Sequence, residues 1–104
     1  MPHNPRKRFG QNFLVDNQII NRIISTINPK NNEIIVEIGP GKGALTIPIL
    51  GHLDHLNVIE IDRDLVSLLN SLQQDKLTIF EADALQFDFN QFPQKIRVIG
   101  NLPY

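Results

Sequence analysis

The stretch IIVEIGPGKGA, residues 34–44, joins a run of branched apolar residues to a glycine-rich turn. A short apolar run of this kind is typical of a strand that is buried on both faces of a parallel sheet. The glycines leave backbone amides at the start of a helix open to a ligand, because no Cβ atoms block the approach. The stretch therefore predicts an α/β fold with a ligand site at the carboxyl edge of its sheet.

Three helices are predicted around this stretch, one before it and two after it. Asp16 is expected to cap the first, which ends at Asn28-Pro29. The second spans 44–53 and contains a proline, which should bend it or lie near its first turn. The third opens at Asp62 or Asp64. Its buried side is expected to carry Leu65, Val66, Leu68, Leu69 and Leu72.

Further apolar runs predict strands at 56–61, 77–80 and 96–99, which with 34–38 make about four. Strands of branched apolar residues that alternate with helices indicate a parallel sheet covered by helices on both faces. Residues 84–95 hold three phenylalanines in no clear period and are expected to form a loop or a short, irregular helix.

Composition narrows the class of protein. The chain has 104 residues, of which 41% are apolar and 20% charged, as expected for one soluble globular domain over 16–104. No run is long enough to span a membrane, and the absence of cysteine excludes disulfides and thiolate metal sites and favours the cytoplasm. Residues 1–15 form a basic arm, in which Arg6, Lys7 and Arg8 are expected either to touch nucleic-acid phosphates or to remain solvated.

Acidic residues at the strand ends are candidate ligand-binding groups. Glu60 ends the second strand, where a carboxylate can accept both hydroxyls of a ribose. Asp83 follows the third strand and is placed to accept from an adenine amino group. Glu37, inside the first strand, needs a cationic partner because a buried carboxylate is costly without one. A helix cap or a solvated loop charge is an equally good explanation for any one of them.

Two other nucleotide-binding motifs compete for the glycine turn. A phosphate-binding P-loop is excluded, because Gly43 follows Lys42 where that motif needs Ser or Thr. Residues 39–44 satisfy the dinucleotide pattern G-x-G-x-x-A, and Glu60 stands about 20 residues further on. Glu37 argues against a dinucleotide, since that position is ordinarily apolar, and favours a cationic ligand such as the methionine ammonium of S-adenosylmethionine.

Five segments together resemble the signatures of the ribosomal RNA adenine dimethyltransferases, in order and spacing. They are RKRFGQNFL (6–14), EIGPGKGALT (37–46), VIEIDRDL (58–65), EADAL (81–85) and GNLPY (100–104). The resemblance implies a Rossmann-like class I methyltransferase that dimethylates two adjacent adenines near the 3′ end of 16S small-subunit ribosomal RNA, in ribosome biogenesis. Chains of that family are much longer, so this one is expected to lack later strands and a helical C-terminal domain.

The resemblance also implies roles for individual residues. The expected S-adenosylmethionine-binding residues are Gln11, Asn12, Leu14, Glu37, Gly39, Gly41, Glu60, Asp83 and Asn101. In the catalytic segment, the Asn101 side chain and the Leu102 carbonyl accept hydrogen bonds from the adenine amine. Pro103 fixes the backbone, and Tyr104 stacks on the extruded base. The expected partner is the immature small ribosomal subunit, bound by a monomer without a metal.

Two alternatives from other classes stay open. One is a non-catalytic RNA-binding or ribosome-assembly module, which needs no intact cofactor pocket. The other is a fragment of an NAD-binding oxidoreductase, which predicts binding of NADH and not of S-adenosylmethionine.

Overall fold

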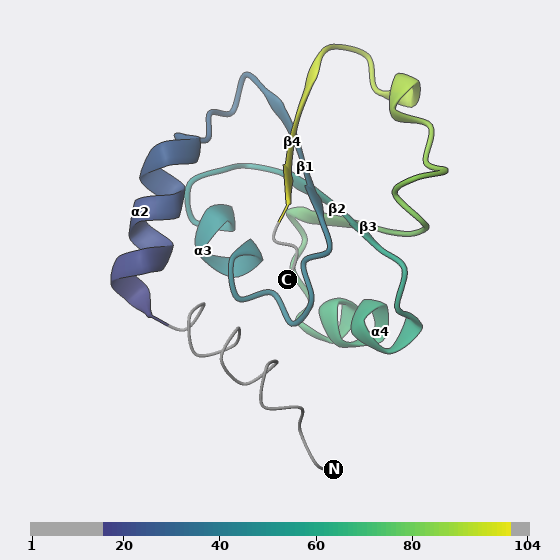
Figure 1. Ribbon diagram of the computed structural model, residues 1–104, viewed down its shortest axis with the longest axis horizontal. Helices are drawn as coiled ribbons and strands as arrows, with labels where there is room; N and C mark the ends of the chain where they lie inside the picture. The colour runs from purple at the N-terminus through teal and green to yellow at the C-terminus, as the bar shows by residue number, and fades with distance from the viewer. Residues whose placement is uncertain (1–15, 101–104) are drawn as a thin grey trace.

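The computed structural model describes residues 16–100, the coloured ribbon of Figure 1. Two groups of predicted site residues lie outside this part of the chain and remain predictions. The first belongs to the arm and comprises Arg6, Lys7, Arg8, Gln11, Asn12 and Leu14. The second is the expected catalytic segment, Asn101, Leu102, Pro103 and Tyr104.

The described residues form a four-stranded parallel sheet of order β3-β2-β1-β4. Its strands are β1 (Ile34–Ile38), β2 (Leu56–Glu60), β3 (Leu77–Glu81) and β4 (Ile96–Gly100). Each predicted strand is confirmed to within one residue at either end. The register pairs Ile38 with both Ile59 and Gly100, and Glu60 with Glu81, so the carboxyl ends of the strands lie level at one edge.

Helix α2 (Asn17–Ile27) begins and ends where its capping residues predict. The Asp16 carboxylate accepts hydrogen bonds from the amides of Gln18 and Ile19. Asn28 ends the helix in the left-handed conformation, with φ of 48°. Left-handed backbone suits asparagine at a helix C-terminus, so the predicted stop is confirmed.

Helix α3 (Thr46–Leu50) is shorter than the predicted 44–53. Pro48 is its third residue, where the missing N–H costs nothing because the first amides of a helix have no internal partner. An earlier start would move Pro48 into the helix interior. After Leu50 the chain tightens into turns, in which the Gly51 amide donates to the Pro48 carbonyl at 3.1 Å.

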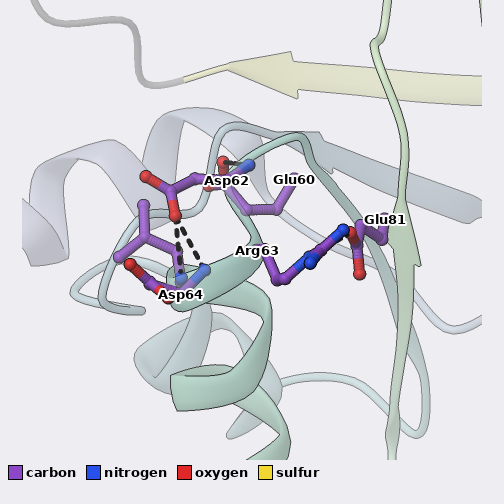
Figure 2. A network of polar contacts seen from close by, with 6 residues as sticks. Glu60, Asp62, Arg63, Asp64 and Glu81 are labelled. Atoms are coloured by element: carbon purple, nitrogen blue, oxygen red, sulfur yellow. Dashed lines mark hydrogen bonds and ion pairs between the residues drawn. The ribbon is translucent and has the colours of Figure 1, made fainter.

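Helix α4 (Arg63–Ser71) starts after Asp62, whose carboxylate accepts from the amides of Asp64 and Leu65 (Figure 2). Asp62 is therefore the cap, and Asp64 lies inside the first turn. The prediction that Leu68 is buried is wrong, since its side chain is 39% exposed. Val66 and Leu69 define the buried face, and Leu68 falls about 100° around the helix from Leu69.

One core joins all three helices to a single face of the sheet. Its buried members include Ile20 and Ile24 of α2, Ile49 of α3 and Leu69 of α4, packed with Val58 of β2. The sequence predicted helices on both faces. Within residues 16–100 the second face instead carries part of segment 82–95, where Phe87 and Phe92 contact Phe80, and Val98 of β4 stays 49% exposed. That segment has no helical period, and only the short 3-10 helix η1 (Phe89–Gln91) forms in it. No helix in the described range is long and apolar enough to cross a membrane.

Candidate functional site

The glycine turn after β1 passes close to the end of β2. The Gly39 amide donates to the Ile59 carbonyl at 2.9 Å, and Gly39, Gly41 and Gly43 all have positive φ. A Cβ atom added to Gly41 would meet nothing within 4 Å, whereas one on Gly43 would lie 3.5 Å from the Leu69 side chain. Gly41 therefore borders open space that a ligand can enter. Gly43 has room for a side chain, so its positive φ is what favours glycine there.

Glu60 ends β2 and is held rigidly beneath this turn. Its side chain is only 6% exposed. One carboxylate oxygen accepts from the Gly41 amide at 3.2 Å and the other from the Asp62 amide at 3.0 Å. Figure 2 shows Glu60 beside Asp62 at the start of α4. Each oxygen keeps further lone-pair capacity, so the carboxylate is oriented to accept hydroxyl groups of a ligand.

Glu37 lies fully buried in β1, with an exposed fraction of 0%. One carboxylate oxygen accepts from the Thr46 hydroxyl at 2.6 Å, and the other, Oε2, has no partner within residues 16–100. Burial raises the pKa of Glu37 from 4.5 to about 7, with the Thr46 bond opposing the rise and the Glu60 charge adding to it. A cationic group nearby would favour the ionised form of this carboxyl.

Thr46 is a site residue that sequence reasoning missed. The expected partner of Glu37 was a ligand cation, and the structure shows that the first residue of α3 already supplies one hydrogen bond. The signal in the sequence was a hydroxyl residue one turn beyond the glycines. Threonine is common at the start of a helix because it can cap the helix. Its position in the sequence therefore did not indicate a contact with Glu37.

Asp83 lies in the turn after β3, at the same edge as Glu60. Its Oδ1 accepts from the Leu85 amide at 2.9 Å, which fixes the carboxylate within the turn. Its Oδ2 accepts no hydrogen bond from the described chain. The neighbouring Ala82 amide donates to the Glu60 carbonyl at 3.1 Å. The structure thus brings Glu60 and Asp83 together at one edge, as the sequence predicted.

Two exposed apolar side chains flank these acids and were also missed. Ile61 directly follows Glu60 and is 66% exposed, and Leu85 lies two residues after Asp83 and is 94% exposed. Ile61 was assigned to a strand, and nothing in the sequence distinguished Leu85 from a packing residue. Both side chains lie next to acids of the candidate site, so they are available for apolar contact with a ligand bound there.

Arg63 and Glu81 make an ion pair at the outer part of this edge (Figure 2). The Arg63 Nε lies 3.8 Å from a Glu81 oxygen, and both side chains are exposed. Exposed pairs contribute about 0–1 kcal/mol. Glu81 is therefore a surface residue. No group of acidic or histidine side chains in the described chain is arranged to hold a metal ion.

The open space at Gly41, the oriented Glu60 carboxylate and the unpaired Glu37 oxygen together fit S-adenosylmethionine. That molecule carries a ribose with two hydroxyls and a cationic amino acid part. The residues that would hold it are Glu37, Gly39, Gly41, Glu60, Ile61, Asp83 and Leu85.

We expect the free energy of unfolding of the wild-type chain to fall between pH 4.5 and pH 7, and Glu37→Gln to remove this fall. The unfolded chain releases the Glu37 proton near pH 4.5 and the folded chain only near pH 7, so the free energy of unfolding falls as pH rises through this window. This difference between the pKa values of the unfolded and folded chains corresponds to a fall of about 3 kcal/mol in the free energy of unfolding. Urea denaturation across pH 4.5–8 measures it.

Glu81→Gln is the matched control, since it removes a carboxylate that is exposed at the end of β3. We expect it to leave the pH dependence nearly unchanged. An equal pH slope in Glu37→Gln and wild type would show that the buried carboxyl does not titrate as described.

Solved structures resemble this fold. A dimethyladenosine transferase from Plasmodium falciparum matches with a TM-score of 0.68 and 28% identity, over 84% of this chain and 32% of that one. The 23S rRNA methyltransferase ErmE matches with a TM-score of 0.74 and 28% identity, over 86% of this chain and 36% of that one. The sheet order, the glycine turn and the acid ending β2 define the chain as a class I S-adenosylmethionine-dependent methyltransferase fold.

Within that class, residues 2–104 match the family model described as ribosomal RNA adenine dimethylase, and the chain belongs to this family. A Nitrosospira multiformis protein named Ribosomal RNA small subunit methyltransferase A is 53% identical over 105 residues, covering 100% of this chain. A protein of the same name from a Shewanella species is 56% identical over 107 residues, covering 98% of this chain. This chain spans 40% of the length of each of these relatives.

Proposed function

We propose that the chain is the cofactor-binding and catalytic part of an enzyme that dimethylates adenines of small-subunit ribosomal RNA with S-adenosylmethionine. The observation that carries the proposal is the Glu60 carboxylate, which is buried, oriented by Gly41 and Asp62, and adjacent to Asp83 at one sheet edge. Membership of the adenine dimethylase family supports the substrate class.

Different residues of the described chain are proposed to bind different parts of the cofactor. Glu60 accepts hydrogen bonds from the ribose hydroxyls, and Asp83 Oδ2 accepts one from the adenine amino group. Ile61 and Leu85 would supply apolar contacts to the adenine ring. Glu37 stabilises the cationic methionine part through its charge. When bound, S-adenosylmethionine supplies a methyl group on a sulfonium sulfur.

The catalytic segment would begin directly after β4. Gly100, the last residue of that strand, pairs with Ile38 immediately before the glycine turn, so β4 ends beside that turn. Asn101 Oδ1 and the Leu102 carbonyl would accept from the adenine amine and direct its lone pair towards the methyl group. The amine held by Asn101 and Leu102 would receive the methyl group that S-adenosylmethionine supplies and would release a proton to solvent. Oxygen acceptors stabilise the positive charge that develops on nitrogen.

The target adenine must leave its stack to reach this edge, which costs a few kcal/mol. Stacking of the adenine on Tyr104 would offset about 1–3 kcal/mol of the free energy of unstacking. The proposed enzyme acts in the cytoplasm on immature small ribosomal subunits during ribosome biogenesis, as a monomer.

The basic arm would hold the RNA backbone. Changing Arg6, Lys7 and Arg8 together to glutamine is expected to weaken binding to RNA by a similar factor whatever the RNA sequence. It should lower the slope of log affinity against log salt by about 2, because three phosphate contacts are lost. Filter binding across a salt series measures the slope. Lys30→Gln, an exposed lysine before β1, is the control and should leave it unchanged.

Transfer of labelled methyl groups to immature small subunits tests the proposal. We expect transfer by a chain of the relatives' length that carries this N-terminal part. RNA binding without transfer would support the assembly-module alternative and contradict the proposal.

A further inference from the structure

Four phenylalanines that the cofactor site does not use form a cluster on the sheet face opposite the helices. Ile79 packs into the helical core, so Phe80, its neighbour in β3, points to the other face. The Phe80 and Phe87 rings meet edge to face with centroids 5.1 Å apart. Phe89 joins Phe87 at 5.0 Å, and Phe92 joins Phe80 at 6.2 Å. Such contacts stabilise beyond the burial of apolar area.

The Phe80–Phe87 contact closes a short loop, residues 81–86, that carries Asp83. At its start the Ala82 amide donates to the Glu60 carbonyl, which ties the loop to β2. Inside it, the Leu85 amide donates to Asp83 Oδ1, and the Gln86 amide to the Asp83 carbonyl, both at 2.9 Å.

Leu85 is almost fully exposed and cannot anchor this loop to the sheet. The next apolar residue is Phe87, and its partner Phe80 immediately precedes the loop. The aromatic contact therefore restrains both ends of the loop at once, which lowers the conformational freedom of the Asp83 carboxylate.

We propose that Phe87, acting through Phe80, is a positioning residue that sets the preference of the site for adenine over a purine lacking the amino group. The inference rests on the proposed function, in which Asp83 accepts a hydrogen bond from the adenine amino group. Phe87 touches no ligand itself. It holds the loop at the spacing from Glu60 that a nucleoside requires.

The test compares two ligands by calorimetry: S-adenosylhomocysteine and S-inosylhomocysteine, in which a carbonyl oxygen replaces the amino group. Wild type should bind the adenosyl compound at least about 10-fold more tightly, as expected for loss of a charge-assisted hydrogen bond. Asp83→Asn should remove most of this preference. Phe87→Leu should reduce the preference at least about threefold, because it keeps apolar volume and loses the edge-to-face contact.

Phe89→Leu is the matched control, since Phe89 contacts Phe87 and lies outside the closed loop. It should keep the wild-type preference, as should Phe87→Tyr, which retains the ring. The ratio of the two affinities does not respond to a general loss of folded protein, because unfolding lowers both equally. If Phe87→Leu does not fold, Phe80→Leu removes the same contact from the strand side.

An unchanged ratio in the leucine variant would overturn the positioning role, and so would an equal fall in Phe89→Leu. Failure of wild type to bind S-adenosylhomocysteine at all would instead refute the proposed function, and the positioning role with it. The two failures are therefore distinguishable in one set of titrations.

Discussion

Replacing Glu60 with alanine is expected to raise the dissociation constant for S-adenosylmethionine by about 100-fold or more. The wild-type carboxylate is buried and accepts from the Gly41 and Asp62 amides, so under the proposal it would meet the ribose hydroxyls without a cost of reorganisation. Each charge-assisted hydrogen bond contributes about 1.5–3 kcal/mol, and the loss of two corresponds to about 3 kcal/mol at the lower bound. Calorimetric titration of the folded variant measures the change.

Glu81→Ala provides the control, because Glu81 is the residue paired with Glu60 in the neighbouring strand and its side chain is exposed. It should bind the cofactor as wild type does. Glu60→Gln separates the contact with the glycine turn from the negative charge. Its amide oxygen can still accept from the Gly41 amide, but the charge is lost. Equal weakening by the Glu81 and Glu60 variants would contradict the assigned role.

Asn101→Ala is expected to slow methyl transfer by about 100- to 1,000-fold while cofactor affinity stays within about twofold. The loss of an oriented acceptor at a site of developing charge has effects of this size. The measurement uses single-turnover transfer of labelled methyl groups to immature small subunits, with a chain of the relatives' length.

Leu102→Ala is the matched control for Asn101, because the proposed acceptor at residue 102 is its main-chain carbonyl, which alanine keeps. We expect a near-normal rate. If Asn101→Ala instead loses cofactor binding with the rate of bound enzyme preserved, residue 101 is a cofactor ligand and not part of the chemical step.

The strands were predictable because each is a short run of mainly apolar residues bounded by polar or turn residues. Helix limits were less predictable where a single residue decides them. Pro48 shortens α3 from the N-terminal side, and a rotation of about 100° separates exposed Leu68 from buried Leu69. The second face lacks a helix within the described range because segment 82–95 packs through phenylalanines, whose pairing carries no sequence period.

The acids of the site were predictable, and their partners were not. Glu60 and Asp83 follow strands whose carboxyl ends must share one edge, so topology alone brings them together. Thr46 contacts Glu37 through the exact packing of α3 on β1, which no local pattern encodes. Gly41 and Gly43 look alike in the sequence, yet a Cβ atom would meet open space at Gly41 and the Leu69 side chain at Gly43.

The central claim is that the carboxyl edge of this sheet binds S-adenosylmethionine. Calorimetric titration of the chain with S-adenosylmethionine and, separately, with NADH tests it most directly. We predict saturable binding of one S-adenosylmethionine per chain and no heat of binding with NADH. Saturable NADH binding together with no response to S-adenosylmethionine would contradict the account and favour the dinucleotide reading of the glycine turn.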